Sequence, residues 1–365
     1  MLQHKKYLYL AIVTIISLGS CNLTSENHPL AKRPTAFGRI NDVVILTDAA
    51  IAESTIKDTI SAYFEAPYPV LTADEPLFDI RYMTPTDLEI KPLRKELRTY
   101  ILLADVSDTT LTATKMLRDD LGEERFHKAQ TDTTFTTMVG NDKWAKDQMI
   151  VYVFADGRPR LTKAIRDNFP NIAKKINQHD KKNLSATVYG IKNDNRELEK
   201  ITLDSFGLNI KIPGLYQLAM NQPNFLWMRL DDKEMNQSIV IQKFPYINKD
   251  QFSMSNIIKM RNEYGKQYIK TSSADAYMTT NDEDLPTLEY TYINNGIYTK
   301  EVRGIWETVN DFMGGPFVSY LLLNEPKGEV VFIDVFVYAP GKDKRDYVQQ
   351  LDCIVKTASF PDVKK

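Results

Sequence analysis

The chain has few of the side chains on which metal sites and nucleophilic hydrolases depend. It contains two cysteines and four histidines among 365 residues. His4 and His28 lie near the N-terminus, while His127 and His179 stand among charged residues in RFHKAQ and NQHDKKN. No CxxC, HExxH, GxSxG or P-loop pattern occurs. These absences argue against a histidine-dependent triad and a zinc site, so we predict no catalytic set, no metal and no cofactor.

An excess of positive charge is also missing. The formal net charge is −2 at pH 7. A nucleic-acid partner normally requires a strongly basic face, so we predict none.

The one long hydrophobic run is too short to span a bilayer, which takes about 20 apolar residues. It covers Tyr7 to Leu18 and follows a basic start with Lys5 and Lys6. This order predicts a signal peptide over residues 1–20. Leu18-Gly19-Ser20-Cys21 resembles the bacterial lipobox, which implies cleavage before Cys21 and transfer of lipid to its thiol; the alternative is an ordinary signal beside a bystander cysteine.

The residues after Cys21 predict a location. Two or three acyl chains on one cysteine anchor a protein stably, whereas one chain holds only marginally. The stretch that follows has no Asp next to the cysteine and no acidic cluster. By analogy with lipoprotein sorting, we expect an outer-membrane lipoprotein that faces the periplasm. Residues 21–37 are polar and contain proline, so they are predicted to form a tether.

Cys353 would then have no intrachain disulfide partner. It lies in a stretch whose apolar residues share one helical face, with Cys353 nearly opposite. Those residues are Tyr347, Val348, Leu351, Ile354, Val355 and Ala358. We expect a free thiol against a second packing surface; an intermolecular disulfide or a reactive role is the alternative.

The sequence divides into two mixed regions, so the predicted fold class is α+β with two domains. In residues 38–195, the apolar runs Val43–Thr47 and Thr99–Val106 each precede a helical pattern, which predicts an α/β domain. A polar stretch between Tyr189 and Asp204 marks the boundary.

In residues 196–365, the stretch from Gly207 to Tyr246 alternates in the manner of antiparallel strands, a helical pattern follows from Phe252 to Ile269, and Asn295-Gly296 is a hairpin signal. They predict an antiparallel sheet with packed helices. This order of elements resembles photosystem-associated lumenal proteins of the PsbP type.

Carboxylates on two late strands are the candidates for a polar pocket. In VVFIDVFVY, Asp334 shares a face with Phe332, Phe336 and Tyr338, where an unpaired charge is costly. EVRGIWE places Glu301, Arg303 and Glu307 on one face, which makes Arg303 a partner for Asp334 if the strands are neighbours. These four form either a structural ion-pair group or the floor of a pocket of the kind that paired-carboxylate hydrolases use.

Two charged stretches also have alternative interpretations. NDEDLPTLE clusters Asp282, Glu283 and Asp284 but lacks the glycine and spacing of a calcium loop, which favours a solvated loop. The run from Arg158 to Lys182 carries eight basic residues against two acidic ones. It is either a solvated helical face or a contact for anionic lipid headgroups or an acidic partner.

Several stretches together resemble one family. They are the lipobox at Cys21, DEPLFDI, DKWAKDQMIVYV, RGIWETVNDFMGGPF and FVYAPGKDKRDYVQQLD. The chain is similar, over nearly all of its mature length, to the Bacteroidota lipoproteins of domain-of-unknown-function family 4837. The resemblance implies no activity.

The resemblance includes Gly314-Gly315-Pro316, a sequence that suits a tight turn before the strand FVSYLLL. The alternative is a glycine-lined approach where a ligand meets backbone amides beside Trp306, Asn310 and Asp311.

Two functions remain open from the sequence. The first is a non-enzymatic periplasmic lipoprotein that binds a protein or an envelope component. The second is a carboxylate-dependent envelope hydrolase that uses Glu301, Glu307 or Asp334.

Overall fold

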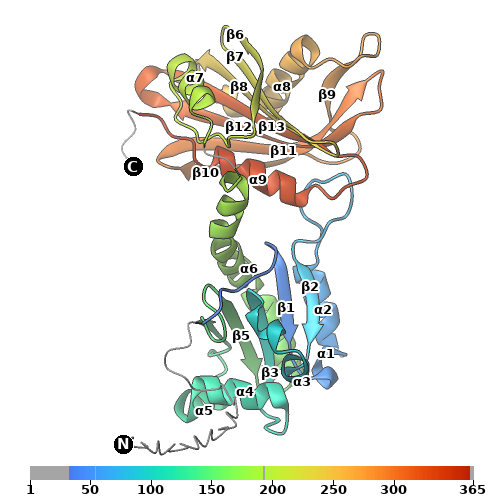
Figure 1. The fold of residues 1–365 in the computed structure, drawn as a ribbon, viewed down its shortest axis with the longest axis vertical. Coiled ribbons are helices and arrows are strands. Elements are labelled where there is room, and N and C mark those ends of the chain that lie inside the picture. Colours follow the sequence, from blue (N-terminus) through green and yellow to red (C-terminus); the bar gives the residue numbers. More distant parts are fainter. Residues whose placement is uncertain (1–32, 54, 192–193, 362–365) are drawn as a thin grey trace, which may run out of the picture.

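The computed structural model describes residues 33–53, 55–191 and 194–361. The predicted signal peptide, the lipidation site Cys21 and most of the tether lie outside these ranges. Each helix within them is too short or too polar to cross a membrane. The chain forms two domains, one above the other in Figure 1, with the long helix α6 running between them.

The N-terminal domain is a five-stranded sheet covered by helices on both faces. The strand order is β2-β1-β3-β5-β4, and the pairs are parallel except β4 with β5. The strands are β1 (Asp42–Leu46), β2 (Asp79–Met83), β3 (Thr99–Asp105), β4 (Thr137–Asn141) and β5 (Met149–Ala155). The helices are α1 (Ala49–Ala52), α2 (Thr55–Phe64), α3 (Pro85–Ile90), α4 (Thr112–Leu121), α5 (Glu123–Thr131) and α6 (Arg158–Tyr189).

The two central strands show why this region folds as an α/β domain. Every residue of β3 and β5 is buried, as expected for strands covered on both faces. Ile56, Ile60 and Phe64 of α2 pack on one face together with α6. Leu117 of α4 and Phe126 of α5 pack on the other face.

Helix α6 connects the two domains. It has 32 residues, which at about 1.5 Å per residue gives a length of about 48 Å. Ile165, Ile172 and Ile176 are buried against the N-terminal sheet. Val188 and Tyr189, at the other end of the helix, pack against the core of the C-terminal domain.

The C-terminal domain is an eight-stranded antiparallel sheet. Its order is β10-β11-β12-β13-β8-β7-β6, and β9 also pairs with β11. The strands are β6 (Gln217–Gln222), β7 (Phe225–Asp231), β8 (Asn236–Pro245), β9 (Tyr277–Asn281), β10 (Leu288–Asn294), β11 (Ile297–Val309), β12 (Gly314–Asn324) and β13 (Glu329–Tyr338). The helices are α7 (Arg196–Phe206), α8 (Met254–Tyr268) and α9 (Arg345–Val355). Short 3-10 helices lie at Pro92–Glu96, Lys249–Phe252 and Glu325–Lys327.

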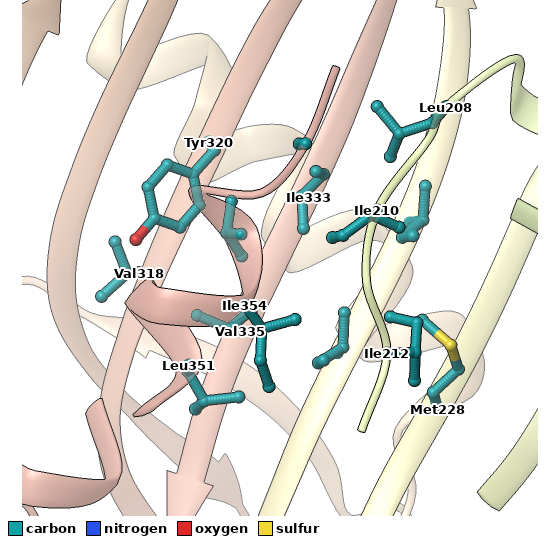
Figure 2. Packing of buried hydrophobic residues seen from close by; sticks show 14 of the residues in the cluster. Leu208, Ile210, Ile212, Met228, Val318, Tyr320, Ile333, Val335, Leu351 and Ile354 are labelled. Carbon is teal, nitrogen blue, oxygen red and sulfur yellow. The ribbon is translucent and has the colours of Figure 1, made fainter. Parts of the chain in front are cut away.

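The two faces of this sheet carry different cores. Ile333 and Val335 of β13 pack with Leu351 and Ile354 of α9, as Figure 2 shows. Phe332, the strand neighbour of Ile333, lies on the opposite face in the aromatic cluster under α8. Because side chains alternate along the strand, successive residues of β13 pack in turn against α9 and against α8.

The N-terminus of α9 is attached to the other domain. Both carboxylate oxygens of Glu75 accept backbone N–H groups, from Lys344 and Arg345, each at 2.7 Å. The Arg345 guanidinium donates to Asp79, the first residue of β2, at 2.8 Å. A carboxylate at a helix N-terminus is stabilising because it meets unpaired N–H groups there. These contacts place α9 against the amino ends of the parallel strands.

The predicted fold class is confirmed: one α/β domain with a mixed sheet and one antiparallel sheet domain with packed helices. The domain limits, 38–195 and 196–365, stay a prediction.

Candidate binding site

The carboxylates on the late strands do not form one pocket. Arg303 of β11 is opposite Val318 of β12, which is opposite Val335 of β13. Residues in such register share one face of a sheet, so Arg303 lies on the α9 side. Asp334 is the strand neighbour of Val335, so its side chain points to the opposite face, which α8 covers. The prediction that Arg303 pairs with Asp334 is therefore wrong, because the two strands are separated by β12 and the side chains point to opposite faces.

Asp334 instead pairs with an arginine from α8. The Nε of Arg261 lies 3.3 Å from a carboxylate oxygen of Asp334, and both side chains are 0% exposed. The hydroxyls of Tyr264 and Ser319 donate to the same carboxylate. The Arg261 guanidinium also lies over the ring of Phe317, 3.9 Å from its centroid. Burial raises the pKa of Asp334, against the opposing effect of the Arg261 charge and the two hydroxyls. The group is sealed from solvent, which indicates a structural role.

The remaining candidates lie where β11 turns into β12. Glu307 is exposed and accepts an amide hydrogen of Asn281 at 2.8 Å. Asp311 accepts the backbone N–H of Phe312, also at 2.8 Å. Trp306 is buried, and its indole N–H donates to the carbonyl of Val337 at 3.1 Å. None of these residues lines the same cavity as Arg303.

The two glycines have a different role from the predicted turn. Gly314 and Gly315 belong to β12, opposite Glu307 and Trp306, and neither has a positive φ. The turn precedes them, with Asn310 in the left-handed region at φ 59°. A Cβ on Gly315 would lie 2.0 Å from the carbonyl oxygen of Val337. The glycine is thus required by the close approach of β13, and the prediction of a turn at Gly314-Gly315 is wrong.

Arg303 is the centre of a second ionic network, which lies under α9. It donates to Asp352 of α9 and to Glu301, both at 2.6 Å, and to the hydroxyl of Tyr68 in the N-terminal domain at 3.3 Å. Tyr320 also donates to Asp352. Burial would raise the pKa of Asp352, but the charges of Arg303 and Lys356 and the hydrogen bonds from Tyr320 and Arg303 together hold it below its usual value. Burial raises the pKa of Tyr68 to about 12, so its hydroxyl stays protonated at neutral pH.

A cleft of about 660 Å³ lies above this network, between α6 and α9. Both domains contribute to its wall, which also includes the segment before β1. It is lined by Ile40, Asn41, Tyr68, Pro170, Ala173, Lys174, Asn177, Gln178, Asp180, Lys181, Leu184, Arg303, Gln349, Asp352, Cys353 and Lys356. Arg303 is the one residue of the predicted pocket in this wall.

Three lysines of the wall are exposed and form no ion pair among the described residues. They are Lys174, Lys181 and Lys356. The acidic residues of the wall are already paired: Asp352 with Arg303, and Asp180 with Arg98 at 3.7 Å. Arg303 carries one positive charge and its partners Asp352 and Glu301 carry two negative charges, so this network has a net charge of −1. The three lysines exceed it. The cleft therefore has a positive balance.

Cys353 faces this cleft rather than a closed packing surface. Its thiol is free and half-buried. Burial raises the pKa of the Cys353 thiol, against the positive charges of Lys356 and Lys181. It is therefore mostly a neutral thiol at pH 7, which does not favour a nucleophilic role.

Sequence reasoning did not single out the lysines of the cleft, although two signals pointed toward them. One was the positive balance of the run Arg158–Lys182. The other was the position of Cys353 opposite the apolar face of its helix, which is the side that α9 turns toward α6. The sequence alone does not show which basic residues form ion pairs in the fold, so it could not identify the lysines that remain unpaired.

The other stretches considered from the sequence form no such site. A hollow of about 540 Å³ at the end of β5 is lined by Arg160 and Asp156, which pair with each other at 3.2 Å. Burial lowers the pKa of His179, which keeps it neutral. Asp284 accepts an amide hydrogen of Asn281 at 2.6 Å. Within the described ranges, no three His, Cys, Asp or Glu side chains are grouped closely enough to hold a metal ion.

The region that carries α7, the antiparallel sheet and α9 can be compared with protein families. Residues 195–357 match the DUF4837 family model. Its description is "Domain of unknown function". The N-terminal region, residues 36–189, matches a second model, DUF8532, with the same description. DEPLFDI and DKWAKDQMIVYV lie in this second match, so the DUF4837 model covers less of the chain than the predicted resemblance did. The cleft is lined from both the DUF8532 and the DUF4837 regions.

Similarity to solved structures is weak. A mutant of the protein Mog1 is 11% identical, with a TM-score of 0.29 over 42% of this chain and 90% of that one. The Ran-binding protein Mog1p of Saccharomyces cerevisiae is 10% identical, with the same TM-score and coverage. Human STARD10 is 10% identical, with a TM-score of 0.22 over 45% of this chain and 74% of that one. No curated protein sequence matches the chain. The likeness to PsbP-type proteins stays a prediction.

Proposed function

We propose that this protein is a lipoprotein of the cell envelope that binds a protein or an envelope component in the cleft between its two domains. It is anchored to the outer membrane through lipid on Cys21 and faces the periplasm. The observation that supports binding is the cleft itself, about 660 Å³ in volume and walled by both domains. Ligand sites are commonly clefts of about 300–1,000 Å³, and many lie at domain interfaces.

The side chains of the cleft wall are held by hydrogen bonds within the N-terminal domain and across the domain boundary. Asn41 donates to the side chain of Gln349 at 2.8 Å, and its backbone N–H donates to Asp180 at 2.9 Å. Tyr68 accepts from Arg303 beneath. A site whose side chains are fixed before binding loses less conformational entropy when the ligand arrives.

The hydrolase alternative receives no support from the geometry. Paired-carboxylate catalysis needs two carboxyl groups that flank one bond of the substrate. Asp334 is sealed under α8, and Glu301 is bound to Arg303 on the opposite face of the sheet. Glu307 lies at the β11–β12 connection. We therefore do not propose catalysis by these residues.

Crosslinking in living cells tests the binding proposal. A photoreactive residue at Asn177, which is exposed in the cleft, should capture one envelope component reproducibly. The matched control carries the same group at Glu124, exposed on α5 and outside the cleft. Capture of the same component from both positions, or of none from Asn177, would contradict the proposal.

The anchor has its own test. The parent protein should incorporate a palmitate analogue and sediment with the membrane fraction. Cys21→Ser should lose the label and appear in the soluble fraction, because the thiol must accept lipid before the signal peptide is cleaved. An unlabelled parent protein would exclude the anchor while leaving the cleft proposal standing.

A further inference from the structure

The basic run that forms α6 divides into paired and unpaired residues. Arg160, Lys163, Arg166 and Lys182 each form an ion pair with an aspartate. The other four, Arg158, Lys174, Lys175 and Lys181, form none among the described residues, and of these Lys174 and Lys181 line the cleft. These two are seven positions apart, which places them two turns apart on one face of the helix. That face is the one that borders the cleft.

Lys356 approaches the same place from the other domain. It lies directly after the last residue of α9 and lines the cleft opposite α6. The charges of both Lys356 and Lys181 act on the thiol of Cys353, so the two lysines converge on one region of the cleft. Neither domain alone brings them together. The exposed amides of Asn177 and Gln178 lie beside them in the wall.

We propose that the cleft binds a phosphate-bearing ligand, with Lys174, Lys181 and Lys356 supplying the positive charge. This rests on the proposed function of the cleft as the binding site, and it names the ligand class. A phosphate group carries up to two negative charges and three strong acceptor oxygens, so it can engage several ammonium donors at once. A single carboxylate carries one charge, whereas a phosphomonoester or pyrophosphate carries two or more, and an anionic membrane surface presents several phosphodiester charges side by side.

The ligand can come from two sources with the same chemistry. One is a soluble phosphate ester or pyrophosphate. The other is the phosphate of a lipid headgroup, which an anchored protein meets at the membrane surface. The two sources are distinguished by probes that present phosphate in solution or on a vesicle.

Cys353 provides a native reporter of occupancy. In the full chain with Cys21→Ser it is the only thiol. We would measure its rate of alkylation by iodoacetamide, which is uncharged, with pyrophosphate, with phosphatidylglycerol vesicles and with phosphatidylcholine vesicles. Sodium chloride at matched ionic strength controls for screening. A ligand that covers the thiol, present at about ten times its dissociation constant, should slow alkylation about tenfold.

Lysine variants test whether the slower alkylation of Cys353 is caused by ligand binding at the proposed site. Lys174→Gln combined with Lys181→Gln should abolish protection, expressed as the ratio of rates with and without the probe in the same variant. This ratio removes the direct effect of Lys181 on the thiol. Lys175→Gln is the matched control, because Lys175 is the exposed neighbour of Lys174 and does not line the cleft.

Each outcome is decisive. Protection by pyrophosphate indicates a soluble ligand, and protection by phosphatidylglycerol vesicles alone indicates a lipid headgroup; both support the proposal if the double variant loses it and Lys175→Gln keeps it. No protection by any probe, equal protection by phosphatidylcholine and phosphatidylglycerol vesicles, protection that persists in the double variant, or equal loss in Lys175→Gln overturns it. Specific crosslinking from Asn177 together with no phosphate protection would retain the binding function and reject the ligand class.

Discussion

Two ionic networks lie on opposite faces of the same sheet, and they differ in access. The Arg261–Asp334 group is covered by α8, with both side chains 0% exposed. The Arg303–Asp352 group lies under α9, with side chains 11% and 7% exposed, and borders the cleft. Both use arginine, aspartate and tyrosine hydroxyls. The same set of side chains therefore has a structural role where α8 seals it from solvent. Where it borders the cleft, it forms part of a candidate binding site.

Burial raises the pKa of both aspartates, but the net shifts have opposite directions. Burial raises the pKa of Asp334 despite the nearby Arg261. The pKa of Asp352 is lowered, because the charges of Arg303 and Lys356 and the hydroxyl of Tyr320 together outweigh burial. The charge at Asp352 is thus better compensated than that at Asp334.

The largest effect is expected in the sealed network. Arg261→Met leaves the Asp334 charge buried without its partner, which should lower the free energy of unfolding by about 4 kcal/mol. Urea unfolding in a Trp144→Phe background would follow the C-terminal domain through Trp227 and Trp306. The double variant Arg261→Met/Asp334→Asn should recover a large part of the loss, and a loss below about 1 kcal/mol in the single variant would show that Asp334 is not charged.

A smaller, pH-dependent effect is expected in the network at the cleft. Asp352→Asn removes a charged acceptor of two hydrogen bonds and should cost about 2 kcal/mol at pH 7. A carboxyl whose pKa is lowered by folding stabilises the protein above its unfolded pKa, and this contribution is lost as the pH falls through the folded value. The difference between parent and variant, measured by urea unfolding, should therefore shrink below about pH 4. A difference that grew on acidification would mean that the pKa is raised instead.

The smallest effect concerns the link between this network and the other domain. Tyr68→Phe removes the hydrogen bond to Arg303 and should lower the free energy of unfolding by about 1 kcal/mol. Tyr82→Phe is the matched control, because the buried hydroxyl of Tyr82 has no hydrogen-bond partner among the described residues. Equal losses in the two variants would show that Arg303 does not couple the domains through Tyr68.

The face of the sheet on which each side chain of β13 lies could be predicted from the sequence. The alternation in VVFIDVFVY separates Phe332 and Asp334 from Ile333 and Val335, and the structure places these pairs in different cores. The strand–helix alternation likewise predicts the two fold types, because it depends on periods of two and of about 3.6 residues.

The partners could not be predicted, because they come from distant elements. Asp334 hydrogen-bonds to Tyr264, 70 positions away, and Arg303 to Asp352, 49 positions away. Strand order and helix docking decide such pairs, and no local pattern encodes them. The cleft depends in addition on how the two domains meet. For the same reason, the sequence could not show which lysines of α6 remain unpaired.

The position of α9 in the chain has a consequence for the timing of folding. The hydrogen bond from Asn41 to Gln349 joins residues 308 positions apart, whereas the N-terminal sheet closes within residues 42–155. Contacts at such separation form slowly, because a long segment must be ordered first. The N-terminal domain can therefore fold while the rest of the chain is still being made or exported, and the cleft becomes complete only when α9 arrives. Pulse alkylation of Cys353 during refolding should show the change to its native, half-buried alkylation rate as one of the last events.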